Sequence, residues 1–430
     1  MSKASDLLRV HVTSAGDTHE DPKGRFFFDE SHGRFTQDLS AVRLLRLGVD
    51  TVRQLYKGML RPEVLCLFDQ PGIVRFAGHS WHVSRIGRDS GYQYKLQNAD
   101  LGFVLLLKNF NVKQDVLGPH LKIEVSPHAI DCRSPDELQR FMDGLAAAVL
   151  THCEPNQCAV HLALDVQGWT PPADLTARMH CRATNQRRFD GVASFEFADK
   201  AVTYGAGQSF LWGSAGGCQL GIYNKTLQAK AIDKLDYWES VWRRSDSFDE
   251  GDPANYDPEA PVWRVEFRYH HSVVEQFAQG SACKGSGELI QTRTFSEFAP
   301  HLDGLWRYGF GNFRLLARPS KFDPAWTLFR DDVRVETGLT SLLDGTEYRR
   351  YYKTAKGFSG RNVDLMMGNF VSLLARQGVG AKKGFEALKS LPVWDVVSDY
   401  YAGKDLTERD IYRKLRDALE ERTIRWGRAV

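Results

Sequence analysis

The chain has 430 residues, of which 42% are hydrophobic and 26% are charged, a balance typical of folded globular domains. It has 56 Lys and Arg residues against 54 Asp and Glu residues. The resulting net charge of +2 neither requires nor excludes a nucleic-acid partner, which needs clustered cations rather than a large total. No apolar run approaches the roughly 18 residues of a membrane span, and the polar start has no signal-peptide core. We therefore expect a cytoplasmic protein with no membrane partner.

Several common chemistries find no support in the sequence. The seven cysteines are scattered and contain no CxxC pair, so we expect reduced thiols rather than a zinc site or a disulfide framework. The sequence has no GxxxxGK[ST] loop, so ATP hydrolysis of the P-loop kind is not encoded. It also lacks HExxH and Gly-x-Ser-x-Gly motifs.

Residues 1–72 predict an N-terminal arm followed by a small helical cap. The first 35 residues are polar and rich in Gly and Asp. From Asp38 to Leu60, apolar residues recur at three- and four-residue steps, as on the buried stripe of a helix. Gly48 interrupts this stripe, so we expect two short helices, with a helix-turn-helix as the weaker alternative.

Residues 73–290 predict an α+β domain. Five β-rich runs between Ile73 and Val125 are separated by Gly, Asn and Asp turn signals. Ser134-Pro-Asp-Glu137 is a capping box that starts a helix reaching about Thr151. Further strands are expected at 159–166, 193–197, 201–204, 209–212, 218–223 and 262–269, and further helices at 225–244 and 271–279. This order favours a central antiparallel sheet flanked by helices.

Residues 291–430 predict a helical C-terminal module. Helices are expected at 295–316, 361–376, 380–390 and 406–425, because apolar residues there recur at helical spacing. The module contains the cations of Arg349–Lys356 and Lys382–Lys383. It is a candidate for DNA binding or for oligomerisation, a homodimer being the simplest oligomer.

Three strand motifs place reactive side chains on shared faces. His161 and Asp165 face one side of an apolar strand, because side chains two apart in a strand point the same way. Tyr223 and Lys225 share a face at the end of another strand. In Trp263-Arg-Val-Glu-Phe-Arg268 a row of Arg, Glu and Arg faces one side, which indicates a lined site or a charged edge.

Together the three motifs contain what the transfer of a phosphodiester to tyrosine needs. Carboxylates hold hard cations such as Mg²⁺ or Mn²⁺, which neutralise and polarise a phosphate. A tyrosine, with an ordinary pKa of about 10, must lose its proton before it attacks. A neighbouring lysine would stabilise the charge that develops. By spacing alone, each motif is also compatible with a structural role.

The same motifs resemble the replication initiation factor family of rolling-circle plasmids, conjugative elements and filamentous phages. The resemblance runs from Gly91 to Phe277. It is carried by Gly91-Tyr92, Gly118-Pro-His-Leu-Lys-Ile-Glu124, Ala159-Val-His-Leu-Ala-Leu-Asp165, Gly213-Ser214, Ile222-Tyr-Asn-Lys225 and Trp263-Arg-Val-Glu-Phe-Arg268. The third motif keeps the final Asp of the family's Arg-x-Asp-hydrophobic-Ala-x-Asp strand and lacks the first Arg and Asp.

The resemblance implies a divergent relaxase-type nicking domain with specific site residues. Tyr223 would be the nucleophile, assisted by Lys225. Asp165 and Glu266 would hold Mg²⁺ or Mn²⁺, with Glu124 as a third ligand. The basic motif Tyr351-Tyr352-Lys353 is a rival location for the nucleophile. We expect further DNA contacts from the cations Arg187, Arg188, Arg264, Arg268 and Lys353.

The implied function is rolling-circle replication initiation in a bacterial host. The protein would bind double-stranded origin DNA, nick one exposed strand, and keep a 5′-phosphotyrosine. The free 3′-OH would prime a host DNA polymerase, while a host helicase unwinds the duplex. A conjugative relaxase acting at a transfer origin and a non-catalytic origin-binding initiator or repressor are the alternatives.

Overall fold

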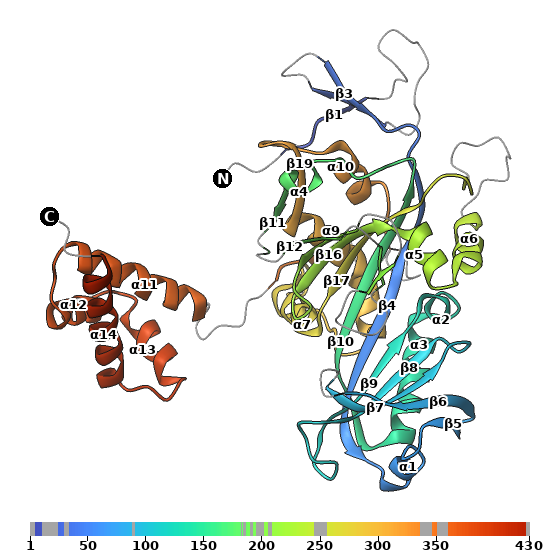
Figure 1. Ribbon diagram of the computed structural model, residues 1–430, viewed down its shortest axis with the longest axis horizontal. Coiled ribbons are helices and arrows are strands. Elements are labelled where there is room, and N and C mark those ends of the chain that lie inside the picture. The colour runs from blue at the N-terminus through green and yellow to red at the C-terminus, as the bar shows by residue number, and fades with distance from the viewer. Residues whose placement is uncertain are drawn as a thin grey trace. The chain divides into compact units, whose positions relative to one another are not determined.

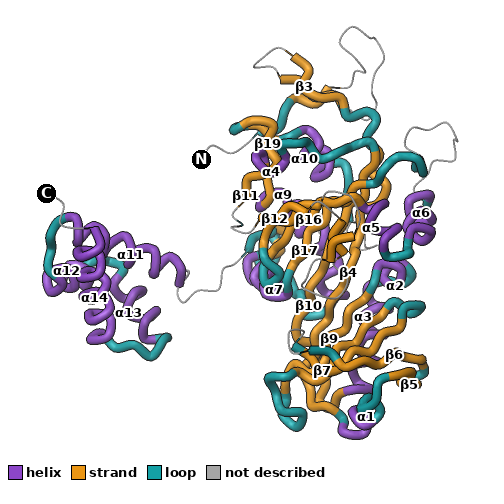
Figure 2. Tube along the Cα trace, viewed as in Figure 1, coloured by secondary structure: helices purple, strands orange, loops and turns teal. Residues whose placement is uncertain are grey.

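The computed structural model divides the chain into two compact units, Met1–Arg349 and Arg350–Val430, whose elements are shown in Figures 1 and 2. The described residues are 5–10, 25–29, 34–87, 91–181, 183, 186–189, 192–194, 202–204, 209–244, 256–335, 346–350 and 360–426. Because the division lies between Arg349 and Arg350, the predicted domain boundary at residue 290 is wrong. The reason is packing: Trp306 and Phe310 stack edge-on against Phe267, which joins the segment after 290 to the core of the sheet.

Eleven of the described strands form one large sheet in the first unit, and every neighbouring pair is antiparallel. The sheet confirms the predicted α+β class with a central antiparallel sheet. In spatial order the strands are β12 (Gln186–Phe189), β15 (Ser209–Gly213), β16 (Cys218–Asn224), β17 (Trp263–Tyr269), β10 (Leu150–Gln167), β4 (Arg43–Leu60), β9 (Gly118–Val125), β8 (Phe103–Asn109), β7 (Tyr92–Asn98), β6 (His79–Arg85) and β5 (Gly72–Phe76).

The longest strands, β4 and β10, have 18 residues each and run side by side through the middle of the sheet (Figure 1). The prediction of two helices between Asp38 and Leu60 is thus wrong. Register shifts skip Leu45 and Asp50 in the pairing with β10. Each extra residue resets the alternation of the side chains, so that Val49 and Val52, three residues apart, are both buried in the main core. The bulges in β4 therefore give its buried residues the three-residue spacing that is typical of a helix.

Helices cover both faces of this sheet. The main core includes apolar residues of α3 (Pro135–Val149), α7 (His271–Gly280), α8 (Phe295–Phe298), α9 (Leu302–Asn312) and α10 (Pro324–Asp331). The capping box predicted at Ser134 and Glu137 is confirmed at the start of α3. A second, smaller core joins Leu45 of β4 to α5 (Lys225–Ala231) and α6 (Leu235–Arg243). The single helix predicted over 225–244 is divided near Asp233, which has a left-handed φ of 54°.

Smaller elements complete the first unit. The N-terminal segment contains strands rather than a helical cap: β1 (Leu8–Val10), β2 (Phe26–Asp29) and β3 (Arg34–Asp38) form a separate sheet. The predicted helix 295–316 is divided into α8, a 3-10 turn and α9, and a strand begins at Phe313. The remaining elements are α1 (Pro62–Cys66), α2 (Pro127–Asp131), α4 (Leu175–Arg178), β11 (Met179–Cys181), β13 (Val192–Ser194), β14 (Val202–Tyr204), β18 (Ala282–Cys283), a 3-10 turn (Ala299–His301), β19 (Phe313–Arg318), β20 (Lys321–Phe322) and β21 (Thr346–Glu347).

The second unit is helical, as predicted, although it begins later than expected. It contains α11 (Gly360–Arg376), α12 (Ala381–Lys389), α13 (Trp394–Ala402) and α14 (Glu408–Trp426). These helices bury a core of their own, in which Leu388, Val397 and Leu415 are almost fully inaccessible. Among the described helices of both units, none combines the length and apolarity needed to cross a membrane.

Candidate active site

The candidate site lies on the central strands of the sheet, where β4, β10, β17 and β16 are consecutive neighbours. The pairing sets Tyr223 of β16 beside Arg264 of β17, and His161 of β10 beside Arg268. Arg264, Glu266 and Arg268 alternate along β17 with Val265 and Phe267, which belong to the main core. The row of charges predicted on one face of this strand therefore exists.

The hydroxyl of Tyr223 donates a hydrogen bond of 2.9 Å to Oε2 of Glu266. Tyr223 is only 4% exposed. Burial and the negative charge of Glu266 raise its pKa well above the ordinary value, since both disfavour the phenolate. Tyr223 is therefore held in its protonated form, and its hydroxyl proton is directed at a carboxylate oxygen.

Lys225, the first residue of α5, is also buried. Its Nζ donates to Oε1 of Gln228 at 2.7 Å and lies 4.2 Å from the centre of the Trp238 ring. Burial, together with the positive charge of Arg264, lowers the pKa of Lys225 to about 7. The amine can thus exist in either protonation state near neutral pH.

Glu266 is the residue on which the site converges. Arg268 donates to both of its oxygens, from Nε at 2.7 Å and from Nη2 at 3.0 Å. Nδ1 of His161 lies 3.3 Å from Oε1. Burial alone would raise the pKa of Glu266, but the charge of Arg268 and the contact with His161 outweigh it and hold the pKa well below the usual range. Glu266 is therefore an anion.

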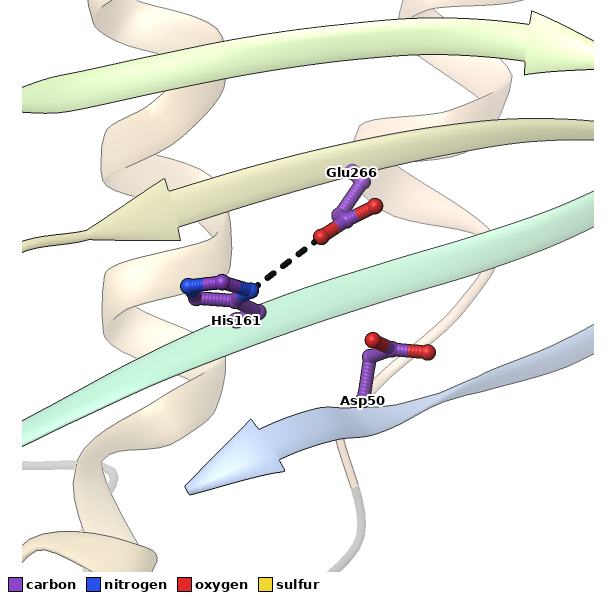
Figure 3. Close-up of side chains that lie close together, drawn as sticks. All are labelled: Asp50, His161 and Glu266. Carbon is purple, nitrogen blue, oxygen red and sulfur yellow. Dashed lines mark ion pairs between the residues drawn. The ribbon is translucent and has the colours of Figure 1, made fainter. Parts of the chain in front are cut away.

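Three side chains from adjacent strands form a group that could hold a metal ion: Asp50 of β4, His161 of β10 and Glu266 of β17 (Figure 3). One ligand atom from each lies within 4.8 Å of the other two. Burial lowers the pKa of His161, so its imidazole is neutral and has a lone pair available at neutral pH. Two carboxylates and one imidazole suit Mn²⁺ better than Mg²⁺, which prefers oxygen ligands alone.

Asp50 reaches this group because of the irregularity in β4. Between Val49 and Thr51 the pairing with β10 skips Asp50, which is the extra residue of a bulge. Bulges re-aim side chains and are common beside functional sites. Asp50 and Thr51 consequently both line the same cavity, although adjacent residues of a regular strand face opposite sides.

Asp165 does not belong to this candidate metal group, and the structure corrects its predicted role. Its oxygens receive hydrogen bonds from Arg264 at 2.6 and 2.8 Å, and the indole of Trp242 donates to Oδ2 at 2.9 Å. Asp165 and Arg264 are both fully inaccessible. Arg264 also pairs with Asp50. Asp165 therefore holds Arg264 in place, and Arg264 cannot serve as the predicted DNA contact, because it has no exposed surface.

Glu124, the predicted third ligand, is buried in the wall of the same cavity but lies outside the group of three. Its Oε1 pairs with Arg53 at 3.1 Å and with Lys122 at 3.0 Å. Its Oε2 has no hydrogen-bond partner among the described residues. The two cations hold its pKa below the usual range, although burial opposes them.

A cavity of about 370 Å³ gathers half of the predicted site residues: Tyr223, Lys225, Glu124, Glu266 and Arg268. The structure does not bring the other predicted DNA contacts here. Arg187 and Arg188 belong to the edge strand β12, and their side chains lie outside the described residues. Lys353 and the rival Tyr351-Tyr352 pair also lie outside the described residues.

Comparison with known proteins identifies a phage relative. A protein of Pseudomonas phage Pf1, described as uncharacterized protein ORF430, is 56% identical over 425 residues, which cover 98% of each chain. The chain belongs to the ORF430 family. No family model matches the sequence, and no solved structure matches it. Membership in the ORF430 family therefore adds a phage relative but no activity.

The sequence left two parts of this candidate site unassigned. Asp50 was missed because its segment was interpreted as helical; the β-branched residues of Val49-Asp-Thr-Val52 were the available signal. His161 was noted on a shared face with Asp165 but not as a metal ligand. Its partner is Glu266 instead, on a strand about 100 residues later in the chain.

Proposed function

We propose that this protein is a rolling-circle replication initiator that nicks one strand of origin DNA and joins itself to the cut end through Tyr223. One observation carries the proposal: the Tyr223 hydroxyl is hydrogen-bonded to Glu266, which also belongs to the group of Asp50, His161 and Glu266. A nucleophile, its proton acceptor and a candidate cation site thus share one carboxylate. The motif resemblance supports the same function, and the phage origin of the relative is compatible with it.

The chemistry conserves atoms and charge. Tyr223 Oη forms a bond to the scissile phosphorus, and the bond from phosphorus to the 3′ oxygen breaks. Glu266 accepts the phenol proton, which ends on the departing 3′ oxygen. The products are a 5′-phosphotyrosine and a free 3′-OH. Because one ester replaces another, the reaction is reversible and can close the circle when replication ends.

The chain's own cations stabilise the charge that develops. Lys225 and Arg268 line the cavity beside Tyr223, close to where a phosphate must lie for attack. A divalent cation held by Asp50, His161 and Glu266 would supply further positive charge to the phosphate and favour the phenolate. The positive charge of a cation would be needed because the raised pKa of Tyr223 disfavours the phenolate that attacks.

The proposed fold assignment is a divergent relaxase-type nicking domain, supported by the antiparallel sheet with helices on both faces. The proposed partners are single- and double-stranded origin DNA, a host DNA polymerase and a host helicase. We assign origin selection to the second unit, whose α12 presents Lys382 and Lys383 to solvent.

A second candidate is a non-catalytic origin-binding initiator or repressor. It is favoured by the two hydrogen bonds from Arg268 to Glu266, because a guanidinium that occupies both oxygens competes with a metal ion. One experiment separates the two. Labelled single-stranded oligonucleotides from the DNA beside the gene are incubated with the full-length protein and Mn²⁺ or Mg²⁺. A labelled protein band that survives denaturing electrophoresis supports nicking, and its absence with every oligonucleotide supports the non-catalytic candidate.

A further inference from the structure

A second, larger cavity adjoins the candidate active site. Its volume is about 720 Å³, and it is lined by parts of β4, β9, β10, β16 and β17 and by the turn at residues 213–216. Arg53, His161 and Arg268 line both cavities. These three side chains therefore form a common wall, and a ligand in the larger cavity would lie across that wall from Tyr223 and Glu266. We call the larger cavity the strand cavity.

The strand cavity is suited to phosphate. Arg53, Lys122 and Arg268 line it, and no carboxylate is among its described lining residues. The carboxylates that pair with these cations, Glu124 and Glu266, line the smaller cavity instead. Arg53 and Lys122 share the single carboxylate of Glu124, which leaves one positive charge over, and Arg268 is paired with Glu266. An anion entering from the strand cavity would meet cations first.

The same cavity carries groups that can contact a nucleobase. The amides of Asn156 and Gln219 line it and offer both donors and acceptors. The rings of His270 and His271 lie 3.8 Å apart at its wall. Nδ1 of His271 is buried and has no hydrogen-bond partner among the described residues.

We infer that the strand cavity binds one or two nucleotides of single-stranded DNA next to the scissile phosphate. The inference rests on the proposed function and adds where the nucleotides beside the scissile phosphate are held. The volume is that of a typical ligand cavity, which admits an unstacked base with its phosphate but not a base-paired duplex. Cations for the backbone and flat rings for the bases are the usual elements of single-strand binding.

Gln219→Glu tests the inference with little change of shape. Gln219 pairs with Arg268 across β16 and β17, so the variant puts a negative charge into a cavity that has no carboxylate among its described lining residues. Gln97→Glu is the matched control, because Gln97 is a half-buried strand residue of the same sheet that lines neither cavity. Fluorescence anisotropy measures how the full-length protein binds a labelled single strand of mixed sequence, about 12 nucleotides long, without divalent metal.

We expect Gln219→Glu to weaken single-strand binding by at least about tenfold, the effect of one unit charge near a phosphate in a partly buried site. Gln97→Glu should bind as the unaltered protein does. A 5-iodouracil-substituted strand should photocrosslink to His270 or His271, located by mass spectrometry. Equal binding by the two variants together with crosslinks elsewhere would overturn the inference, as would tighter binding of duplex DNA or of RNA of the same sequence.

The outcomes separate this inference from the proposed function. If the unaltered protein forms the covalent adduct but Gln219→Glu binds DNA normally, nicking stands and the strand cavity is wrong. If Gln219→Glu weakens binding while no adduct forms with any metal, the strand cavity stands and nicking is wrong. Circular dichroism of both variants, expected to match that of the unaltered protein, excludes unfolding as the cause of weaker binding.

Discussion

The Tyr223 hydroxyl and Glu266 Oε2 are 2.9 Å apart, joined across two neighbouring strands of the central sheet. The phenol proton thus already points at an anionic acceptor, and the raised pKa of Tyr223 keeps that proton in place. In the proposed reaction, a phosphate and further positive charge would favour its loss. The proposed roles of Tyr223 as nucleophile and of Glu266 as proton acceptor can be tested by separate substitutions.

Tyr223→Phe should abolish the covalent adduct and the nick, because it removes only the nucleophilic oxygen. Origin binding should change by no more than a few-fold. The measurement is denaturing electrophoresis with end-labelled DNA, with binding followed in parallel. An adduct that persists in the Phe variant would move the nucleophile elsewhere, with Tyr351 and Tyr352 as the next residues to test.

Glu266→Gln should lower the rate of nicking by about 100-fold or more, because the amide is a poor proton acceptor. It should also release Arg268 from its ion pair. The rate is measured in single-turnover experiments with saturating oligonucleotide, so that weaker binding does not contribute. A loss confined to DNA affinity, with the single-turnover rate intact, would show that Glu266 only positions Arg268.

Asp50→Asn should weaken Mn²⁺ binding at least about tenfold, since even substitutions outside the ligand shell typically cost about 10- to 100-fold. Mn²⁺ is titrated and followed by electron paramagnetic resonance. Asp100→Asn is the control, because Asp100 is an exposed carboxylate of the same cavity outside the group. Nicking should stop in excess EDTA. Full activity in EDTA, or equal Mn²⁺ affinity of the two variants, would contradict a metal held by Asp50, His161 and Glu266.

Asp165→Asn should destabilise the protein rather than empty a metal site. Removing one partner of a buried ion pair costs about 3–5 kcal/mol, because the other charge stays buried. Here that charge is Arg264. Chemical denaturation measures the change, with Asp131→Asn as control, where the partially exposed ion pair with Arg46 contributes about 1 kcal/mol or less. Normal stability combined with lost Mn²⁺ binding would restore Asp165 as a ligand.

Lys225→Met should change how stability depends on pH. The pKa of Lys225 is lowered to about 7 in the folded protein, below its value in the unfolded chain. Between these values the unfolded chain binds more protons, so the contribution of Lys225 to stability rises as pH increases from about 7. Relative to Lys225→Met, the unaltered protein should gain about 1–2 kcal/mol between pH 7 and 9. Lys230→Met, an exposed lysine of the same helix, should leave the pH profile unchanged.

A chain that ends after Arg349 should still nick an exposed single strand but lose preference for its duplex origin. The first unit contains the whole sheet and the candidate site, and each unit has its own core. Competition binding at two salt concentrations separates base recognition from phosphate contacts, which weaken as salt rises. Unchanged origin preference would assign recognition to the first unit.

The sequence by itself determined the local features of this protein. Alternation of apolar and polar residues predicted most strands between 73 and 269, and the Ser134 capping box fixed the start of α3, because these signals depend only on nearby residues. The strand-end position of Tyr223 and the shared face of Arg264, Glu266 and Arg268 likewise follow from a two-residue repeat.

Only the tertiary structure decided which of these residues meet. Asp50 joins His161 and Glu266 through a bulge that depends on the pairing of β4 with β10, and such a register shift leaves a helix-like spacing in the sequence. The sequence predicted Asp165 as a metal ligand, but in the structure Arg264, 99 residues later in the chain, donates hydrogen bonds to both of its oxygens. Long-range pairing in an antiparallel sheet assigns partners across the chain, and residue spacing carries no information about those partners.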